Sequence, residues 1–260
     1  MIFMDVLAKL EALSPIKFAL EFDNTGFQIG RKEKEVHKIC LATDVTDDVI
    51  EQAISGEADL LLTHHALIFK PLAQILADDI IGRRVLKLIR HDINYMSMHT
   101  NFDVIGMADY AADMLALSKR QVLMVTYIEK DVREGIGRFG TLPRPAALGE
   151  CAETVKSSFN LDSVRVYGES SRIIKTAAVS PGSGSDALIY ARKANVDLLI
   201  TGDIKHSMAL EALAYGIALI DAGHFGTEKI FVPYLKEYFE REMPTVEVIA
   251  AEEKNPFYVV

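Results

Sequence analysis

The sequence lacks the long apolar run, the basic leader and the basic excess that mark membrane, secreted and nucleic-acid-binding proteins. No stretch among its 260 residues approaches the ~20 apolar residues that span a bilayer. The opening residues MIFMDVLAKLEALSP indicate an amphipathic helix rather than a signal peptide. Lys and Arg number 28 against 37 Asp and Glu, and the net charge of −9 disfavours binding to nucleic acid or anionic membranes. We therefore expect a cytoplasmic protein.

Two common signatures of a bound group are also absent. The chain has only two cysteines, Cys40 and Cys151, and neither belongs to a CxxC motif. Both lie in apolar stretches, which predicts buried, reduced thiols. The glycine-rich turn at residues 181–185 precedes a predicted helix, so its backbone amides could hold an anion. It is not a P-loop, because no Gly-Lys-Ser/Thr follows.

What the chain does contain is an internal repeat. Residues 39–63 and 176–201 each begin with an apolar run and continue through a polar turn into a helical pattern. They end on nearly identical strands, ADLLLT (58–63) and VDLLIT (196–201). This order is typical of a βαβ unit, here written twice. Continuous apolar strands of this kind favour a buried parallel sheet.

The repeat continues downstream of both units. After a further helical stretch, each copy has an apolar strand, INYMSM in the first and IALIDAG in the second. A histidine follows, with an acid four residues later: His99 and Asp103, then His224 and Glu228. Both pairs are offset by 125 residues (224 − 99 and 228 − 103). Duplication of one α/β lobe is the simplest account, and we expect lobes at residues 1–125 and 126–260, possibly interlocked as one domain.

The segments outside the two copies are predicted more coarsely. Residues 126–168 contain a helical pattern at 147–159 and the strand-like SVRVYG, so they indicate a connecting αβ segment of the second lobe. The stretch KIFVPYLKEYFERE predicts an amphipathic helix near the C-terminus. Its apolar face carries Phe231, Tyr234, Leu235 and Phe239, which we expect in the core.

The chemistry-bearing residues gather where the predicted strands end. In parallel sheets, functional groups lie outside the carboxyl ends of the strands. His64 and His65 follow the first repeat strand directly. Together with Asp103, His224 and Glu228 they form a ligand set that suits zinc, iron or manganese. Three histidines and two acids are too many for one open ion, so we predict two divalent ions with bridging carboxylates. The alternative is a cluster of satisfied buried polar residues.

Other candidates have two interpretations each. His99 is the repeat partner of His224, and we favour a supporting or proton-transfer role over ligation. Asp203, Lys205 and His206 follow the second repeat strand, where they could contact substrate, or Asp203 could cap the next helix. Asp44 is a plausible rim residue at a strand end. The polar segment 21–26 is explained by a turn.

Seven blocks of this sequence, covering nearly the whole chain in the same order, resemble the Nif-three-like dinuclear metal centre family, also called type-two GTP cyclohydrolase I homologues. The blocks are EFDNTGFQIG (21–30), ADLLLTHHALIF (58–69), HTNFD (99–103), GIGRFG (135–140), SPGSGSD (180–186), DLLITGDIKH (197–206) and DAGHFGTEK (221–229). One departure is Phe22, where the family usually has Trp. Longer members carry an inserted domain for which this chain is too short.

The resemblance implies a two-lobed α/β fold with the metals in the cleft between the lobes, and a ring-shaped homohexamer. It maps the family's ligands onto the same five positions that the repeat indicates. It also implies an activity, the hydrolytic opening of the guanine ring of GTP at C8 with release of formate.

Two alternatives to this activity stay open. One is a metal-dependent hydrolase of another nucleotide, a phosphoester or an amide. The other is a metal-binding regulatory or scaffold protein without turnover.

Overall fold

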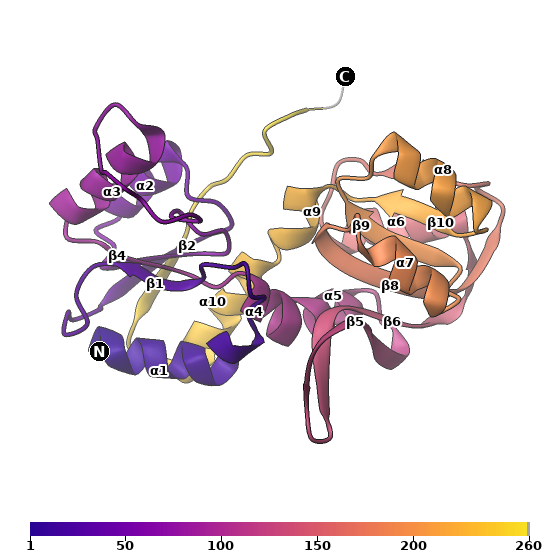
Figure 1. Ribbon diagram of the computed structural model, residues 1–260, viewed down its shortest axis with the longest axis horizontal. Coiled ribbons are helices and arrows are strands. Elements are labelled where there is room, and N and C mark those ends of the chain that lie inside the picture. The colour runs from indigo at the N-terminus through magenta and orange to yellow at the C-terminus, as the bar shows by residue number, and fades with distance from the viewer. Residues whose placement is uncertain (259–260) are drawn as a thin grey trace. The chain divides into compact units, whose positions relative to one another are not determined.

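The computed structural model describes residues 1–258 and divides them into two compact units. The first unit comprises residues 1–102 and 231–254, and the second comprises 103–230 with residues 255–258. The fold is mixed α/β, with one sheet in each unit (Figure 1). A C-terminal segment thus returns to the first sheet, and the expected lobes at residues 1–125 and 126–260 are a statement about the duplication rather than about these compact units. As a boundary of the duplicated lobes, that division stays a prediction.

The first unit is built on a five-stranded sheet of order β1-β4-β3-β2-β11. Strands β2, β3, β4 and β11 are parallel, and β1 pairs antiparallel with β4. Its elements are α1 (Phe3–Leu13), η1 (Ile16–Phe18), β1 (Gly26–Ile29), β2 (Lys38–Ala42), α2 (Asp47–Ser55), β3 (Leu60–Thr63), α3 (Ile80–Arg90), β4 (Asn94–Ser97), α4 (Thr100–Phe102), α10 (Phe231–Glu242) and β11 (Glu247–Ala250).

Helices cover both faces of the first sheet, with α2 and α3 on one side and α1 and α10 on the other (Figure 1). Alternate strand residues such as Cys40 and Leu61 pack with α2 and α3 in one apolar core. On the opposite side Tyr238 of α10 donates a hydrogen bond to the Lys9 carbonyl of α1. The predicted C-terminal amphipathic helix is confirmed, and Phe231, Leu235 and Phe239 are buried, whereas Tyr234 is only half-buried.

The second unit is built on a six-stranded sheet of order β5-β6-β8-β9-β10-β7. Only β8, β9 and β10 are mutually parallel. Its elements are η2 (Asp103–Met107), α5 (Ala108–Met114), β5 (Ser118–Glu129), β6 (Val132–Ala147), α6 (Leu148–Ser158), β7 (Arg165–Tyr167), β8 (Ile173–Ser183), α7 (Ala187–Lys193), β9 (Leu198–Gly202), α8 (His206–Ala214), β10 (Ala218–Asp221) and α9 (His224–Glu228).

The repeat predicted from the sequence is present in both sheets. In the first unit β2, α2 and β3 form a parallel βαβ unit, and β4 joins β3 in parallel. In the second unit β8, α7 and β9 form the equivalent unit, and β10 joins β9 in parallel. The long β5–β6 hairpin was not predicted; Figure 1 shows it extending from the body of its unit.

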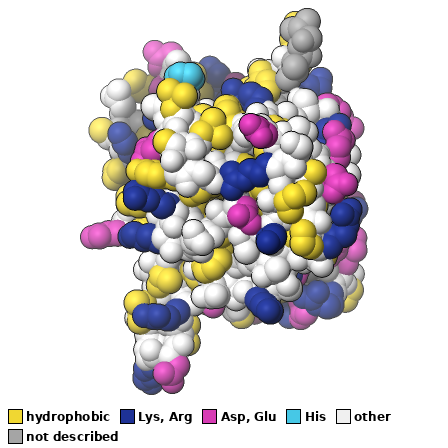
Figure 2. Space-filling view, turned by 90° about the vertical axis from the view of Figure 1, so that its right-hand side faces the viewer, with side chains coloured by type: hydrophobic (Ala, Val, Ile, Leu, Met, Phe, Trp, Pro, Cys, Tyr) yellow, Lys and Arg dark blue, Asp and Glu magenta, His cyan; other side chains and the backbone are white. Residues whose placement is uncertain are grey.

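The surface and the thiols agree with the composition. Both Cys40 and Cys151 are buried and unoxidised, as predicted. On the face of the second unit turned to the viewer in Figure 2, basic side chains are interspersed with acidic ones. No helix within residues 1–258 is long and apolar enough to cross a membrane.

Candidate metal centre

Three histidines of the first unit converge at the carboxyl end of its parallel strands. His64 and His65 follow β3, and their backbone amides still bond to Ala42 and Thr43 beside β2. His99 follows β4. One ring nitrogen from each histidine lies within 4.8 Å of the others. This spacing permits a common cation, and His64 is fully buried while His65 and His99 are half-buried.

The Nδ1 atom of each of these rings has an acceptor in the same unit. His64 Nδ1 lies 2.8 Å from the Met98 carbonyl oxygen, His65 Nδ1 lies 2.8 Å from Asp44 Oδ1, and His99 Nδ1 lies 2.9 Å from Asp23 Oδ1. A carbonyl oxygen can only accept, so the Met98 contact places the proton on His64 Nδ1. In this tautomer the Nε2 lone pair is the one available to a metal, which is the usual arrangement of ligating histidines.

Asp23 is the most completely enclosed of these acceptors, with a side chain that is fully buried. Burial opposes its ionisation, but hydrogen bonds from His99 and from the Thr100 hydroxyl and amide hold the pKa of Asp23 below its ordinary value. The carboxylate therefore stays charged at neutral pH and fixes the His99 ring. The turn assigned to residues 21–26 thus has a second role that the sequence did not reveal.

In the second unit, His224 lies between two carboxylates. Its Nδ1 is 2.7 Å from Asp203 Oδ2 and its Nε2 is 2.9 Å from Glu228 Oε2. The hydrogen bond to Glu228 and the two negative charges, opposed by burial, raise the pKa of His224 to about 9. The ring is therefore cationic at neutral pH. A divalent ion that bound His224 and Glu228 would replace the proton between them.

Two glycines make room for this pair. Gly182 has a φ of +74°, and a Cβ built there would lie 2.1 Å from Glu228 Oε1. A Cβ on Gly202 would lie 2.4 Å from the His224 backbone nitrogen. The glycine-rich turn at residues 181–185 therefore leaves space for the Glu228 carboxylate, whatever else it binds.

Asp103 begins η2, an irregular turn in which Ile105 and Gly106 depart from helical geometry. The side chain of Arg138 in β6 is buried and forms hydrogen bonds with the segment that follows Asp103. It donates to the Val104 carbonyl at 3.4 Å and makes two 2.9 Å hydrogen bonds to Asp109. The GIGRFG block thus supplies a side chain that fixes the backbone next to Asp103.

The donors present in the two units are imidazole nitrogens and carboxylate oxygens. Imidazole and carboxylate are ligands for zinc, iron and manganese. The proposed ligands His64, His65 and His224, and likewise His99, have an oriented ring with a fixed Nδ1 partner, and Glu228 already contacts His224. The structure thus contains His, Asp and Glu groups able to hold a metal ion.

The remaining candidates are placed as follows. Asp203 does not cap the next helix; it has a φ of +56° and bonds to His224. Lys205 occupies the N-cap position of α8 without a side-chain cap, and His206 is the first residue of that helix. His64 and His65 do not cap a helix, because α3 begins only at Ile80.

Sequence reasoning missed the support that Asp23 and Arg138 give. It placed Asp44 at a strand end without its contact to His65. A signal existed for Asp23 and Arg138, since both lie in blocks singled out for other reasons.

Two aromatic side chains lie near the histidines of the first unit. Phe69 is 6.4 Å from the His99 ring and 6.4 Å from the Phe22 ring, centroid to centroid. Both phenylalanines are substantially exposed, Phe22 at 65% and Phe69 at 43%. They offer apolar ring faces at the edge of the histidine cluster.

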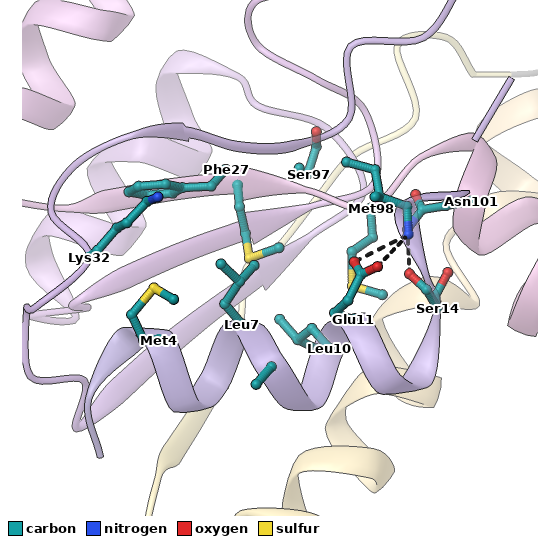
Figure 3. A pocket seen from close by; sticks show the side chains of 14 residues that line it. Met4, Leu7, Leu10, Glu11, Ser14, Phe27, Lys32, Ser97, Met98 and Asn101 are labelled. Carbon is teal, nitrogen blue, oxygen red and sulfur yellow. Dashed lines mark hydrogen bonds between the residues drawn. The ribbon is translucent and has the colours of Figure 1, made fainter. Parts of the chain in front are cut away.

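A separate cavity of about 490 Å³ lies between α1 and the first sheet. Figure 3 shows it lined by apolar side chains such as Leu7, Met4 and Phe27, with Lys32 toward one end. Asn101 donates to the Ser14 carbonyl at the other end. None of the proposed metal ligands lines this cavity, so it is distinct from the histidine cluster.

The fold and these groups define a two-unit α/β protein with a histidine cluster in the first unit and a histidine–carboxylate pair in the second, each at the carboxyl ends of parallel strands. The chain belongs to the Duf34/NIF3 (NGG1p interacting factor 3) family, whose model matches residues 1–256.

Relatives and solved structures agree with this assignment. A Clostridium perfringens protein named GTP cyclohydrolase 1 type 2 homolog is 34% identical over 97% of both chains. A protein of the same name from Clostridium acetobutylicum is 38% identical over 86% of this chain and 84% of its own. The crystal structure of a Bacillus cereus protein related to NIF3 shares the fold, with a TM-score of 0.90 and 23% identity over 100% of this chain and 99% of that one.

Proposed function

We propose that this protein is a metal-dependent hydrolase that holds two divalent ions, zinc, iron or manganese, through His64, His65, Asp103, His224 and Glu228. The observation that carries the proposal is the common orientation of His64, His65 and His224, each with Nδ1 bonded to a fixed oxygen. A ring nitrogen bonded to a fixed oxygen is the usual arrangement of a histidine that ligates a metal through its other nitrogen. The proposal draws its ligands from both units.

The residues of the chain would divide the work. Ions bound there supply Lewis acidity and make water a better nucleophile near neutral pH. Asp44 and Asp203 orient the rings of His65 and His224. Asp23 holds the Nδ1 proton of His99, which leaves Nε2 of that ring to accept or return a proton during hydrolysis. His99 is thus proposed as the proton-transfer residue.

For the substrate we propose a nucleotide, with GTP first. The names of the curated relatives motivate this choice, and the reaction would be opening of the guanine ring at C8 with release of formate. The exposed Phe69 and Phe22 rings support a planar substrate, because aromatic side chains stack on bases of any sequence. A ring-shaped homohexamer is proposed on the resemblance alone.

The first test is metal content per subunit in purified wild type and in His64→Ala and His224→Ala. We expect close to two ions in wild type and a loss in each variant, because each removes a ligand from a different unit. His37→Ala is the matched control, since the exposed ring of this histidine contacts Glu35 and none of the proposed ligands. Wild type that bound no ion after reconstitution with zinc, iron or manganese would refute the proposal.

The second test is formate release from GTP by the metal-loaded protein. Turnover that Phe69→Ala slows through a rise in KM of roughly tenfold, with metal content unchanged, would support the stacking role. Two bound ions without formate release would reject GTP. The remaining alternatives would then be a hydrolase of another substrate and a metal-binding regulatory protein. An open coordination position on the bound metal would favour the hydrolase.

A further inference from the structure

The C-terminal tail after β11 runs along the end of the first sheet that carries the histidines. Ala251 N donates to the Leu41 carbonyl of β2 at 2.9 Å, which continues the parallel pairing of β11 with β2. The backbone of Glu252 is then held on both sides by the Gln52 side chain of α2, at 2.7 and 3.0 Å. These contacts bring the next residue, Glu253, to the loop that follows β2.

The Glu253 carboxylate binds two successive backbone amides of that loop. Thr43 N donates to Oε2 at 2.7 Å and Asp44 N donates to Oε1 at 2.8 Å. Each carboxylate oxygen has its own amide, and hydrogen bonds of this charged kind are short and strong. The loop is thereby fixed by a residue more than 200 positions away in the sequence.

These same two residues hold His65 from both ends. The Thr43 carbonyl accepts from the His65 backbone amide at 2.9 Å. The Asp44 carboxylate accepts from His65 Nδ1 at 2.8 Å. If the loop moves, both the position of the His65 backbone and the orientation of its ring change with it. His64 is different, because its ring bonds to the Met98 carbonyl after β4.

We propose that Glu253 is a positioning residue for His65, acting through the backbone amides of Thr43 and Asp44. The inference rests on the proposed function in one respect, namely that His65 is a metal ligand. The C-terminal tail is then part of the support of the metal centre, and the effect is selective for His65 over His64.

The experiment compares Glu253→Ala and Glu253→Gln with Glu252→Ala, which removes the neighbouring exposed carboxylate. Two readouts are taken on the full-length protein. The first is affinity for Zn²⁺ at each site by competition with a chelator. The second is the ring ¹⁵N spectrum of His64 and His65, recorded without added metal, which reports tautomer directly.

For Glu253→Ala we expect one of the two Zn²⁺ affinities to fall by roughly 10- to 100-fold, the range measured when a residue that orients a ligand is removed. The other ion should bind as in wild type. The His65 ring should lose its single tautomer while His64 keeps it. Glu253→Gln should recover part of the affinity, because its amide oxygen still accepts one of the two amide protons. Glu252→Ala should match wild type in both readouts.

The outcomes separate this inference from the proposed function. Wild-type affinities and an unchanged His65 tautomer in Glu253→Ala would overturn the inference and leave the metal centre standing. A wild type that binds no Zn²⁺, together with a disturbed His65 tautomer in Glu253→Ala, would refute the proposed function and still support positioning by Glu253. Equal disturbance of His64 and His65 would also overturn the inference, because a general loss of structure would produce it.

Discussion

The two units contain the same arrangement of three parallel strands and use its end differently. In the first unit the order is β2, β3, β4, and in the second it is β8, β9, β10, each with the second strand of the βαβ unit in the middle. The registers also correspond. Leu60 of β3 is aligned with residues of both β2 and β4, and Leu198 of β9 is aligned in the same way with residues of both β8 and β10. What differs is the pair of residues that leaves the middle strand.

His64 and His65 occupy that exit in the first unit, and Gly202 and Asp203 occupy it in the second. Gly202 has no side chain because the backbone of His224 occupies the space. Asp203 then orients the His224 ring. The first copy thus places the two histidine rings directly after its middle strand. The second copy places there a carboxylate that orients the His224 ring, which follows the next strand. Duplicated scaffolds can therefore hold unlike residues at equivalent positions.

The units also differ in how they fix the chain beside the candidate ligands. The first unit uses the neutral Tyr95 hydroxyl, which contacts Thr63 Oγ1 at 2.7 Å, Leu67 N at 2.8 Å and the His65 carbonyl at 2.9 Å. The second uses the charged Arg138 guanidinium against Asp109 and Glu134. This contrast predicts different costs for removing the two groups.

The largest expected effect on stability is that of Arg138→Met, at about 3 kcal/mol in the free energy of unfolding, because the buried carbonyl oxygens of Gly135 and Val104 lose their charged donor. Tyr95→Phe should cost about 1–2 kcal/mol, since only a neutral hydroxyl is lost. Urea denaturation of both variants measures the difference. Equal costs would mean that the charged network contributes no more than the neutral one.

Gly202→Ala should follow, at about 2 kcal/mol, because the new methyl group meets backbone atoms of Gly223 and His224 that cannot rotate away. Gly216→Ala is the control: it has a φ of +72° but open space around it, so only backbone strain of about 1 kcal/mol is expected. Thermal unfolding with and without added metal distinguishes them. If the two alanine variants unfolded alike, the close approach of His224 would not constrain the strand exit.

A smaller effect on stability but a clear one on metal is expected for Asp203→Asn and Asp44→Asn. Each keeps the size of the side chain and weakens the hydrogen bond that orients His224 or His65. We expect each to lower metal affinity by roughly 10- to 100-fold, with unfolding nearly unchanged. Isothermal titration with Zn²⁺ provides the measurement. A loss in only one of the two variants would show that the units do not support the centre equally.

The smallest expected effect concerns the two thiols, one in each unit. Burial, reinforced by the charge of Glu253, raises the pKa of Cys40 to about 12, and burial also raises the pKa of Cys151. Because folding raises both pKa values, it lowers the thiolate fraction at pH 8.5. We expect iodoacetamide to leave Cys40 unmodified until the protein unfolds and to reach Cys151 first. Mass spectrometry over time checks this order, and faster labelling of Cys40 would contradict it.

The repeated part of the fold was predictable from the sequence because its signals are local. Apolar runs such as ADLLLT and the 125-residue offset between His99 and His224 identify strands and their order without any knowledge of distant contacts. The confirmed parallel pairing of β2 with β3 and of β8 with β9 follows from those runs. The grouping of His64, His65 and His99 follows from the rule that strand ends share one edge of a sheet.

Other features depend on contacts between distant residues and left no local pattern. The β5–β6 hairpin alternates weakly, because many of its residues are exposed on both faces. Asp23 reaches His99 across 76 positions, and Glu253 reaches Thr43 across 210. Asp203 satisfied a helix-cap pattern equally well, and only the geometry shows that its partner is His224.

The return of α10 and β11 to the first sheet has a consequence for the order in which the two units fold during synthesis. The ribosome releases β1 to β4 long before β11, which completes the sheet by pairing with β2. All strands of the second unit lie within residues 103–230 and pair with strands of that same stretch. Local pairing forms faster than pairing across a long loop. Synthesis therefore favours earlier folding of the second unit, while the first sheet stays open along the edge of β2 until β11 has emerged.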